Sequence, residues 1–444
     1  MAEKPWADMT PEERRAWRIE KWRHPDIAWN SPEAEVAYQA RVDRILAAID
    51  LEKPDRVPVS LLGGFWGAHW GGLTPYDAMS DPARAAQVWK DFNLEFKLDT
   101  QCSPLFAAVS SSMLEHLDYR TYSWPGHGVA KEASFQYNEK EWMLPQEYDH
   151  LISDPSDYML RVYLPRAVGA FAGFNGLSSL WDFIEMPFSS FHMGGWGSPE
   201  MTEGLERLAA ASRSADDWGA SMFGMVDELK SAGFPAYFAG GSKAPFDILG
   251  DTMRGTRGVI MDMFRYPDKV LAACERLVTV AVDWALKRPV QLGTPVIFIP
   301  LHKGADGFMS DEQFMTFYWP TLKAVILGLI EEGCVPLLFA EGHYNTRLEA
   351  IMDLPKGKTV WLFDQTDMAR AKRTIGKVAC IQGNVPLSLM YAGTPEETAA
   401  YCRTLIDSAG EGGGFILDAG AVPDSGKAEN LRAMVKTAEE YGKY

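Results

Sequence analysis

The sequence has no paired cysteines and no long apolar runs. Its 5 cysteines are scattered over 444 residues, and no two of them stand in C-x-x-C spacing. Cysteines scattered in this way are typical of reduced, buried thiols, so we expect a cytoplasmic protein. No uninterrupted apolar stretch reaches the ~18 residues that a membrane-spanning helix needs. Residues 1–26 also have no apolar core, so we expect no signal peptide.

Basic charge is scarce as well. The chain has 43 Lys and Arg residues against 60 Asp and Glu residues, a formal net charge of −17. A surface of this sign repels phosphate backbones and anionic lipid, so we expect neither nucleic acid nor a membrane as a partner. Neither G-x-G-x-x-G nor G-x-x-x-x-G-K-[ST] occurs on a strand–helix turn, which disfavours nucleotide binding.

What is present is an ordinary globular composition with an aromatic N-terminus. The chain is 47% hydrophobic, and four tryptophans lie within residues 1–30. Exposing so much aromatic surface to water is costly. We therefore predict that residues 1–50 form a helical arm that packs either on the body or on a second subunit, which leaves a homodimer open. Ser31 reads as the N-cap of its main helix, with Pro32 at the first helical position.

Strand-like and helix-like segments alternate in the C-terminal half. The strand-like segments are 295–301, 335–342, 359–364, 378–384 and 412–420, and helical patterns follow each of them. This alternation predicts βαβ units and a parallel sheet. We predict an α/β fold, a (β/α)8 TIM-type barrel over residues 51–444. Residues 120–200 interrupt the pattern with many aromatic residues, and we predict that they form an inserted lid over the barrel mouth.

Polar residues stand at the ends of these strand-like segments. In a barrel, the carboxyl ends of the strands form one rim, and catalytic residues sit there. The candidate catalytic residues are Glu341, His343, His302, Asp364 and Asp418, and the candidate substrate-binding residues of this group are Lys303 and Asn384.

Each of these residues also has a simpler structural explanation. Lys303 could form a salt bridge with a neighbouring acid, and Asp364 and Asp418 could cap the helices that follow them. Glu341 and His343 are two residues apart, so an extended backbone would put both on one side. There they could form an acid–base pair, a metal-binding pair or a plain hydrogen-bonded pair.

The loop after the first predicted strand, FWGAHWGG, is aromatic. It supplies Trp66, His69 and Trp70, which we expect to line the pocket, although core packing is an equal alternative. An aromatic lining would suit an apolar or aromatic ligand.

Four segments carry a resemblance to a known family. They are RVPV (56–59), GSKAPFDILGD (241–251), GFMSDEQFMTFYWP (307–320) and IQGN (381–384). In this order and spacing they resemble the uroporphyrinogen decarboxylase superfamily and cover most of the predicted barrel. The resemblance implies a (β/α)8 barrel and one of two activities: decarboxylation, or methyl transfer that depends on cobalamin.

The chain departs from the decarboxylase branch of this family at several positions. The decarboxylases hold the propionates of their substrate with arginines after the first strand, but LLGGFWGAHWGG (61–72) has none. Buried carboxylates need such cationic partners. The family's tyrosine falls at Asp251, which we include among the substrate-binding candidates, and its late histidine falls at Ala421. The comparison implies that uroporphyrinogen is not the substrate.

The thiol-methylating members of the other branch resemble each other in an H-x-C motif and a late cysteine, which bind zinc. Phe339, Glu341 and Ala421 stand at these positions here. Zinc needs three or four convergent ligands, and this chain would have to offer Glu341, His343 and His302 instead. Either a metal is held by this different set, or no metal is used and the rim residues act as acids and bases.

These observations together predict a methyltransferase component. It would move a methyl group between a small, methoxylated or aromatic substrate and a corrinoid carried by a separate protein, because no D-x-H-x-x-G corrinoid signature occurs in the chain. A lyase acting on a smaller carboxylate and a catalytically silent ligand-binding barrel are the alternatives. Release of CO2 without a corrinoid would distinguish the lyase.

Overall fold

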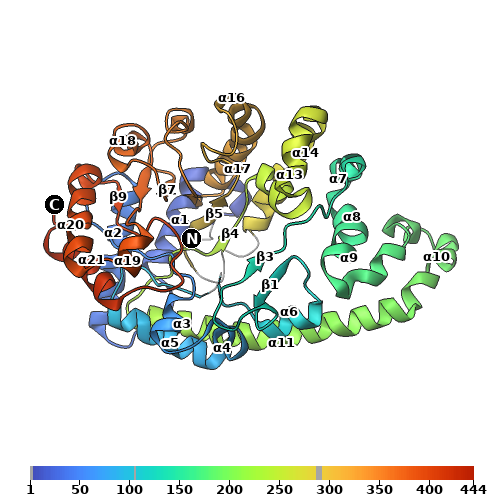
Figure 1. Cartoon of the computed structure of the whole chain (residues 1–444), viewed down its shortest axis with the longest axis horizontal. Helices are drawn as coiled ribbons and strands as arrows, with labels where there is room; N and C mark the ends of the chain where they lie inside the picture. Colours follow the sequence, from blue (N-terminus) through green and yellow to red (C-terminus); the bar gives the residue numbers. More distant parts are fainter. Residues whose placement is uncertain (1–3, 105–106, 287–292) are drawn as a thin grey trace.

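A six-stranded parallel sheet organises the protein (Figure 1). The structure is a computed structural model, and it describes residues 4–104, 107–286 and 293–444. The strands lie side by side in chain order, and every neighbouring pair is parallel. They are β4 (Gly240–Gly241), β5 (Val296–Leu301), β6 (Val335–Ala340), β7 (Val360–Phe363), β8 (Cys380–Gln382) and β9 (Phe415–Ile416). The predicted α/β fold with a parallel sheet is therefore confirmed.

Backbone hydrogen bonds continue beyond both edges of this sheet. The segment around Val59 forms a parallel bridge with Leu417, next to β9. On the other side, Ala239 N donates to Val296 O at 3.0 Å. Further donor–acceptor pairs are Ser60 N to Leu417 O, Asp99 N to Val59 O and Gln101 N to Pro235 O. The first predicted strand thus lies beside the last one, although it forms an isolated bridge and not a regular strand.

The central strands are apolar along their whole length because both of their faces are covered. All six residues of β6 and all four of β7 are buried. Strands that read as continuous apolar runs are typical of parallel sheets flanked by helices. The helices that follow the strands in the chain are α14 (Pro267–Leu286), α17 (Trp319–Glu331), α18 (Met368–Arg373), α20 (Pro395–Leu405) and α21 (Ala428–Glu440).

One predicted helix is largely missing. Residues 346–354, after β6, form turns and the short 3-10 helix η9 (Ala350–Met352). The cause is Arg347, whose side chain is buried and hydrogen-bonds the carbonyl oxygens of Gly304 and Met309. A side chain held against a neighbouring loop fixes the backbone in turns, and this tertiary contact outweighs the local helical pattern.

The N-terminal arm packs on the body of its own chain. It contains α1 (Pro11–Arg23) and α2 (Pro32–Ile49), and Ser31 caps α2 as predicted, accepting a hydrogen bond from Ala34 N. The Trp6 indole donates to Glu332 at 2.8 Å, just beyond α17. Trp22 is fully buried.

The later part of the segment between the arm and β4, from about residue 120, extends away from the six-stranded sheet (Figure 1). A small sheet of β1 (Tyr122–Pro125), β2 (Gly128–Val129) and β3 (Gln136–Tyr137) is followed by the short helices α8 (Pro155–Tyr158), α9 (Leu164–Ala167) and α10 (Met186–His192). The long α11 (Pro199–Ser231) then runs back, and Figure 1 shows α10 at its outer end. The lid function of this segment stays a prediction. None of the helices described is both long and apolar enough to cross a bilayer.

Candidate active site

Three loops at the carboxyl ends of β4, β5 and β6 bring His302, Asp251 and Glu341 together. His302 and Glu341 directly follow β5 and β6, and Asp251 lies in the π-helical turn η7 (Ile248–Met253) after β4. The imidazole Nδ1 of His302 lies 2.5 Å from Asp251 Oδ2, and its Nε2 lies 3.4 Å from Glu341 Oε1. Both ring nitrogens therefore face a carboxylate.

The two carboxylates keep His302 protonated. Burial alone would lower the pKa of His302, but the interactions with Asp251 and Glu341 outweigh it and raise that pKa to about 10. The Asp251 carboxyl is itself desolvated, yet its contacts with His302 and Lys243 hold its pKa well below the usual value. The site therefore contains an imidazolium between two carboxylates at neutral pH.

Two lysines complete what we call the His302 cluster, which consists of Lys243, Asp251, His302, Lys303 and Glu341. Lys243 Nζ lies 2.7 Å from Asp251 Oδ2, and Lys303 Nζ lies 3.4 Å from Asp251 Oδ1. The cluster thus combines three cationic groups with two carboxylates. The side chains of His302 and Glu341 are 33% and 42% exposed, so a ligand can reach them from solvent.

A buried aspartate that the sequence interpretation missed positions this cluster. Asp247 accepts hydrogen bonds from the backbone N–H groups of His302 at 3.1 Å and Lys303 at 3.0 Å, and from the Tyr318 hydroxyl at 2.7 Å. Burial and the nearby charge of Asp251 raise the pKa of Asp247 to about 6. The GSKAPFDILGD segment contains Asp247, but its contact with the β5 loop could not be read from spacing.

Asp418, which follows β9, lies at the end of a buried polar chain. The Gln382 amide donates to Asp418 Oδ2 at 2.6 Å, and the Tyr237 hydroxyl donates to Gln382 Oε1 at 2.6 Å. Burial raises the pKa of Asp418 to about 7, although hydrogen bonds from Gln382 and the backbone oppose the rise. Asp418 is fully buried and does not cap a helix.

The remaining rim candidates have structural partners. His343 Nδ1 lies 2.9 Å from Gln365 O, and the side chain is exposed. Asp364 accepts a hydrogen bond from Gly342 N at 3.0 Å, and burial raises its pKa. The Asn384 amide donates to the carbonyl oxygens of Asp364 and Thr366, which stabilises the turn after β8.

The donor geometry does not fit the zinc site outlined from the sequence. Both nitrogens of His302 are engaged by carboxylates, and Nδ1 of His343 is engaged by a backbone oxygen. Over residues 4–104, 107–286 and 293–444, no group of three or more His, Cys, Asp or Glu side chains is arranged to hold a metal ion. Glu341, His343 and His302 therefore do not form a zinc site in the described residues.

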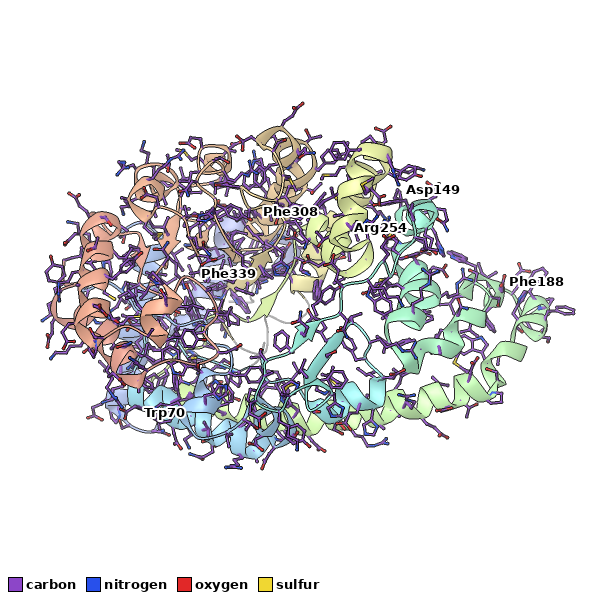
Figure 2. The ribbon with its side chains drawn as sticks, in the orientation of Figure 1. Trp70, Asp149, Phe188, Arg254, Phe308 and Phe339 are labelled. Carbon is purple, nitrogen blue, oxygen red and sulfur yellow. The ribbon has the colours of Figure 1, made fainter. Side chains whose placement is uncertain are left out.

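The tryptophans of the first loop pack away from these strand ends, contrary to expectation. Trp66 and Trp70 lie on the short helix α3 (Trp66–Trp70) and face α5 (Pro82–Phe96). The Trp66 ring centroid is 6.2 Å from that of Phe92, and the Trp70 centroid is 5.7 Å from it. Residues four apart on a helix share one face, so both rings turn to α5 together, while His69 is exposed. Figure 2 shows Trp70 well away from Phe339 of β6.

A different set of rings leads to the His302 cluster. We define the aromatic row as Phe65, Phe135, Tyr122 and Tyr137. Successive ring centroids are 6.3, 5.7 and 5.1 Å apart. The Tyr137 hydroxyl donates a short hydrogen bond to the backbone oxygen of Asp251. The row therefore links the first loop, through β1 and β3, to the cluster. For Tyr122, Phe135 and Tyr137, the only indication in the sequence was the high density of aromatic residues in 120–200.

The sequence relatives are decarboxylases that match part of the chain. The uroporphyrinogen decarboxylase of Chlorobaculum parvum is 26% identical over 191 residues, which is 41% of this chain and 52% of that protein. That of Chlorobium phaeovibrioides is 28% identical over 189 residues, with the same two shares. The enzyme of Psychromonas ingrahamii is 30% identical over 131 residues, 27% of this chain and 36% of that protein. The chain spans about half the length of the first two relatives.

A methyltransferase from Methanosarcina mazei has the same fold. Its structure aligns with a TM-score of 0.58 at 15% identity and covers 91% of this chain and 98% of that chain. The family model described as uroporphyrinogen decarboxylase (URO-D) matches residues 205–441, which is more than half of the sequence and includes the whole His302 cluster. The chain belongs to the uroporphyrinogen decarboxylase family.

Proposed function

We propose that this protein is a methyltransferase component that moves a methyl group between a small molecule and a corrinoid carried by a separate protein. The observation that carries the proposal is the His302 imidazole, whose two nitrogens face Asp251 and Glu341 at the strand ends while its side chain is 33% exposed; these carboxylates raise its pKa, which favours the imidazolium. The fold shared with the methyltransferase from Methanosarcina mazei supports it.

The chemistry follows from what a methyl ether needs. An alkoxide or phenoxide leaves readily only if a positioned acid protonates the departing oxygen. His302 donates this proton from Nε2, while Asp251 holds Nδ1 and fixes the ring orientation. Glu341 stabilises the imidazolium before transfer and then faces the neutral ring. When bound, a reduced corrinoid supplies the cobalt nucleophile that accepts the methyl group.

The corrinoid would have to reach this site from a partner protein. The chain has no D-x-H-x-x-G sequence to hold it. His302 and Glu341 fit such an arrangement because each side chain is about one-third exposed or more, and a ligand on another protein can approach them. Among the rim residues predicted from the sequence, the partly exposed Asp364 and Lys303 would border that approach, whereas Asn384 is buried.

The aromatic row favours an aromatic or methoxylated substrate. Tyr122 and Tyr137 are half-buried, and Tyr137 contacts the residue that orients His302. Aromatic rings bind a planar apolar ligand by stacked or edge contacts. The role assigned from the sequence to Trp66 and Trp70 passes in this proposal to the rings of β1 and β3.

The same proposal includes the closed barrel and the lid. The hydrogen bonds around Val59, Asp99, Gln101 and Pro235 would link β9 back to β4 and complete the ring of strands. Residues 120–200 would cover the mouth of this barrel, with Tyr137 as their contact to the cluster.

A lyase that removes CO2 from a small carboxylate is the second candidate. Lys243 and Lys303 favour it, because their ammonium groups beside the imidazole can pair with a substrate carboxylate. His302 would then protonate the carbanion that is left. Uroporphyrinogen remains an unsuitable substrate, because the loop at 61–72 has no arginine.

One assay separates the two candidates. The protein is mixed with a methoxyphenol and free cob(I)alamin, and methylcobalamin is followed by absorbance. We expect methyl transfer with the natural chain, a loss of ~100-fold or more with His302→Gln, and no loss with His343→Gln. CO2 release from small carboxylates without any corrinoid, together with no methyl transfer, would refute the proposal.

A further inference from the structure

The outer end of the inserted segment exposes a group of large apolar side chains. They lie on the 3-10 helix η5 (Leu180–Phe183), on α10 and just beside them. Phe191 is 84% exposed, Met186 83% and Trp181 72%. We call this group the apolar tip; its members are Trp181, Ile184, Met186, Phe188, Phe191 and Met193. Figure 2 shows Phe188 at the far end of the molecule.

These side chains are not needed to hold the tip together. A separate small core does that: Trp196 packs between Phe183 at 6.2 Å and Phe174 at 6.4 Å, measured between ring centroids. Phe174 belongs in turn to a buried cluster with Leu177 and Met201, where α11 begins. The apolar tip is therefore the outer face of an element whose inner face is already packed.

The exposed area is large for a protein that remains monomeric. If each of the six side chains is assigned about 200 Å², the middle of the range for aromatic residues, their exposed fractions amount to roughly 800 Å². The largest apolar patch on a typical monomer is about 300–600 Å². Each partner of a standard protein–protein interface buries about 800 Å². The apolar tip alone thus has the area that one side of a stable dimer needs.

Charge argues against an anionic membrane surface as the occupant. Between Arg166 and Arg207 the sequence has no lysine or arginine, while it has five acidic residues. Helices that lie on membrane surfaces use Lys and Arg around their apolar face to meet anionic lipid. Only two of the acids, Asp182 and Glu185, lie within the tip, and Asp182 Oδ2 is 3.3 Å from His192 Nδ1.

We propose that the apolar tip is a self-association surface that joins two copies of this chain. In a two-fold arrangement the same patch meets itself, so a mainly apolar, self-complementary face is the simplest interface. The remaining three acids, on α11, stand outside the contact. The tip lies at the outer end of α11, away from the sheet, so the pairing leaves the strand ends accessible (Figure 1).

The first test measures the mass of the full chain in solution by size-exclusion chromatography with light scattering. We expect a dimer for the natural chain and a monomer for the double variant Met186→Glu/Phe191→Glu, with an unchanged far-UV spectrum. Phe264→Glu is the matched control, because Phe264 is 71% exposed but lies on α13 (Gly255–Arg265). A monomeric natural chain, or a dimer that only Phe264→Glu disrupts, would overturn the proposal.

The second test uses the fact that all five native cysteines are buried. Phe188→Cys should be cross-linked into dimers by a short bismaleimide, whereas Phe264→Cys should not be. Equal cross-linking of both variants would count against the tip. Flotation of the natural chain with neutral phosphatidylcholine vesicles, without dimers in solution, would assign the tip to a membrane and refute self-association.

Discussion

Replacing Glu341 by Gln tests the electrostatics of the His302 cluster directly. The substitution keeps the size of the side chain and removes one of the two carboxylates that face the imidazole. Proton donation requires the imidazolium, so activity should fall as pH rises through the pKa of His302, which lies at about 10. Loss of a neighbouring negative charge lowers this pKa, and the fall should move toward neutral pH.

The size of the shift follows from the 3.4 Å between His302 Nε2 and Glu341 Oε1. Two unit charges at this distance attract by about 1 kcal/mol in water and about 5 kcal/mol at an effective dielectric constant of 20. Because the Glu341 side chain is 42% exposed, solvent screening makes an attraction near the lower of these two energies the better estimate. About 1.4 kcal/mol corresponds to roughly one pH unit on the alkaline limb of the profile.

The assay is the pH dependence of kcat/KM for methyl transfer, which reports groups of the free enzyme. Glu349→Gln is the matched control, because Glu349 pairs with Arg370 on the surface and should leave the limb unmoved. An alkaline limb that stays in place in Glu341→Gln, or activity that increases as His302 loses its proton, would refute the role of His302 as an acid.

Three further predictions concern buried groups and the rim. The pKa of Asp418 is about 7 in the folded protein, higher than in the unfolded chain, so the folded state binds the proton more tightly. The free energy of unfolding should therefore decrease as the pH rises from about 4 to 7. Denaturant unfolding measured at both pH values should show a smaller decrease for Asp418→Asn than for the natural chain. Trp66→Ala should cost about 3–5 kcal/mol of stability because the ring is fully buried. The KM of the folded variant should not change, and a raised KM would show that Trp66 contributes to the substrate pocket. His343→Ala should keep both its melting temperature, within a few degrees, and its rate, and a loss of ~10-fold or more would show that we have misassigned this exposed side chain.

The sequence predicted the strands better than it predicted their surroundings. β5, β6 and β7 lie where continuous apolar runs stand between glycine and charged residues, and burial on both faces makes such runs unambiguous. The helix predicted after β6 is mostly absent, because the buried contacts of Arg347 come from a loop some forty residues earlier. A local pattern carries no information about such contacts.

The sequence predicted that the candidate residues lie on one rim, but it did not predict which of them are in contact. His302, Glu341 and Asp251 were all among the candidates, but the pairing of His302 with Asp251 joins residues 51 positions apart and depends on how η7 is placed. The prediction that Trp66 and Trp70 line the pocket was wrong, because aromatic residues in a glycine-rich loop are equally compatible with a pocket and with a core. Asp247 was overlooked since a buried acid beside Pro245 and Phe246 has no distinguishing spacing.

Asp251 contacts the His302 cluster through its side chain and the small sheet through its backbone. Its carboxylate contacts His302, while its backbone oxygen accepts the Tyr137 hydroxyl from β3. If the small sheet moved relative to η7 and drew the Asp251 backbone with it, the Asp251 carboxylate would move away from the imidazole, and the pKa of His302 would fall. His302 would hold its proton most tightly while the small sheet is in contact with Asp251, and it would become a stronger acid if the sheet moved away. Linkage requires the reverse effect as well: deprotonation of His302 weakens the seating of the sheet.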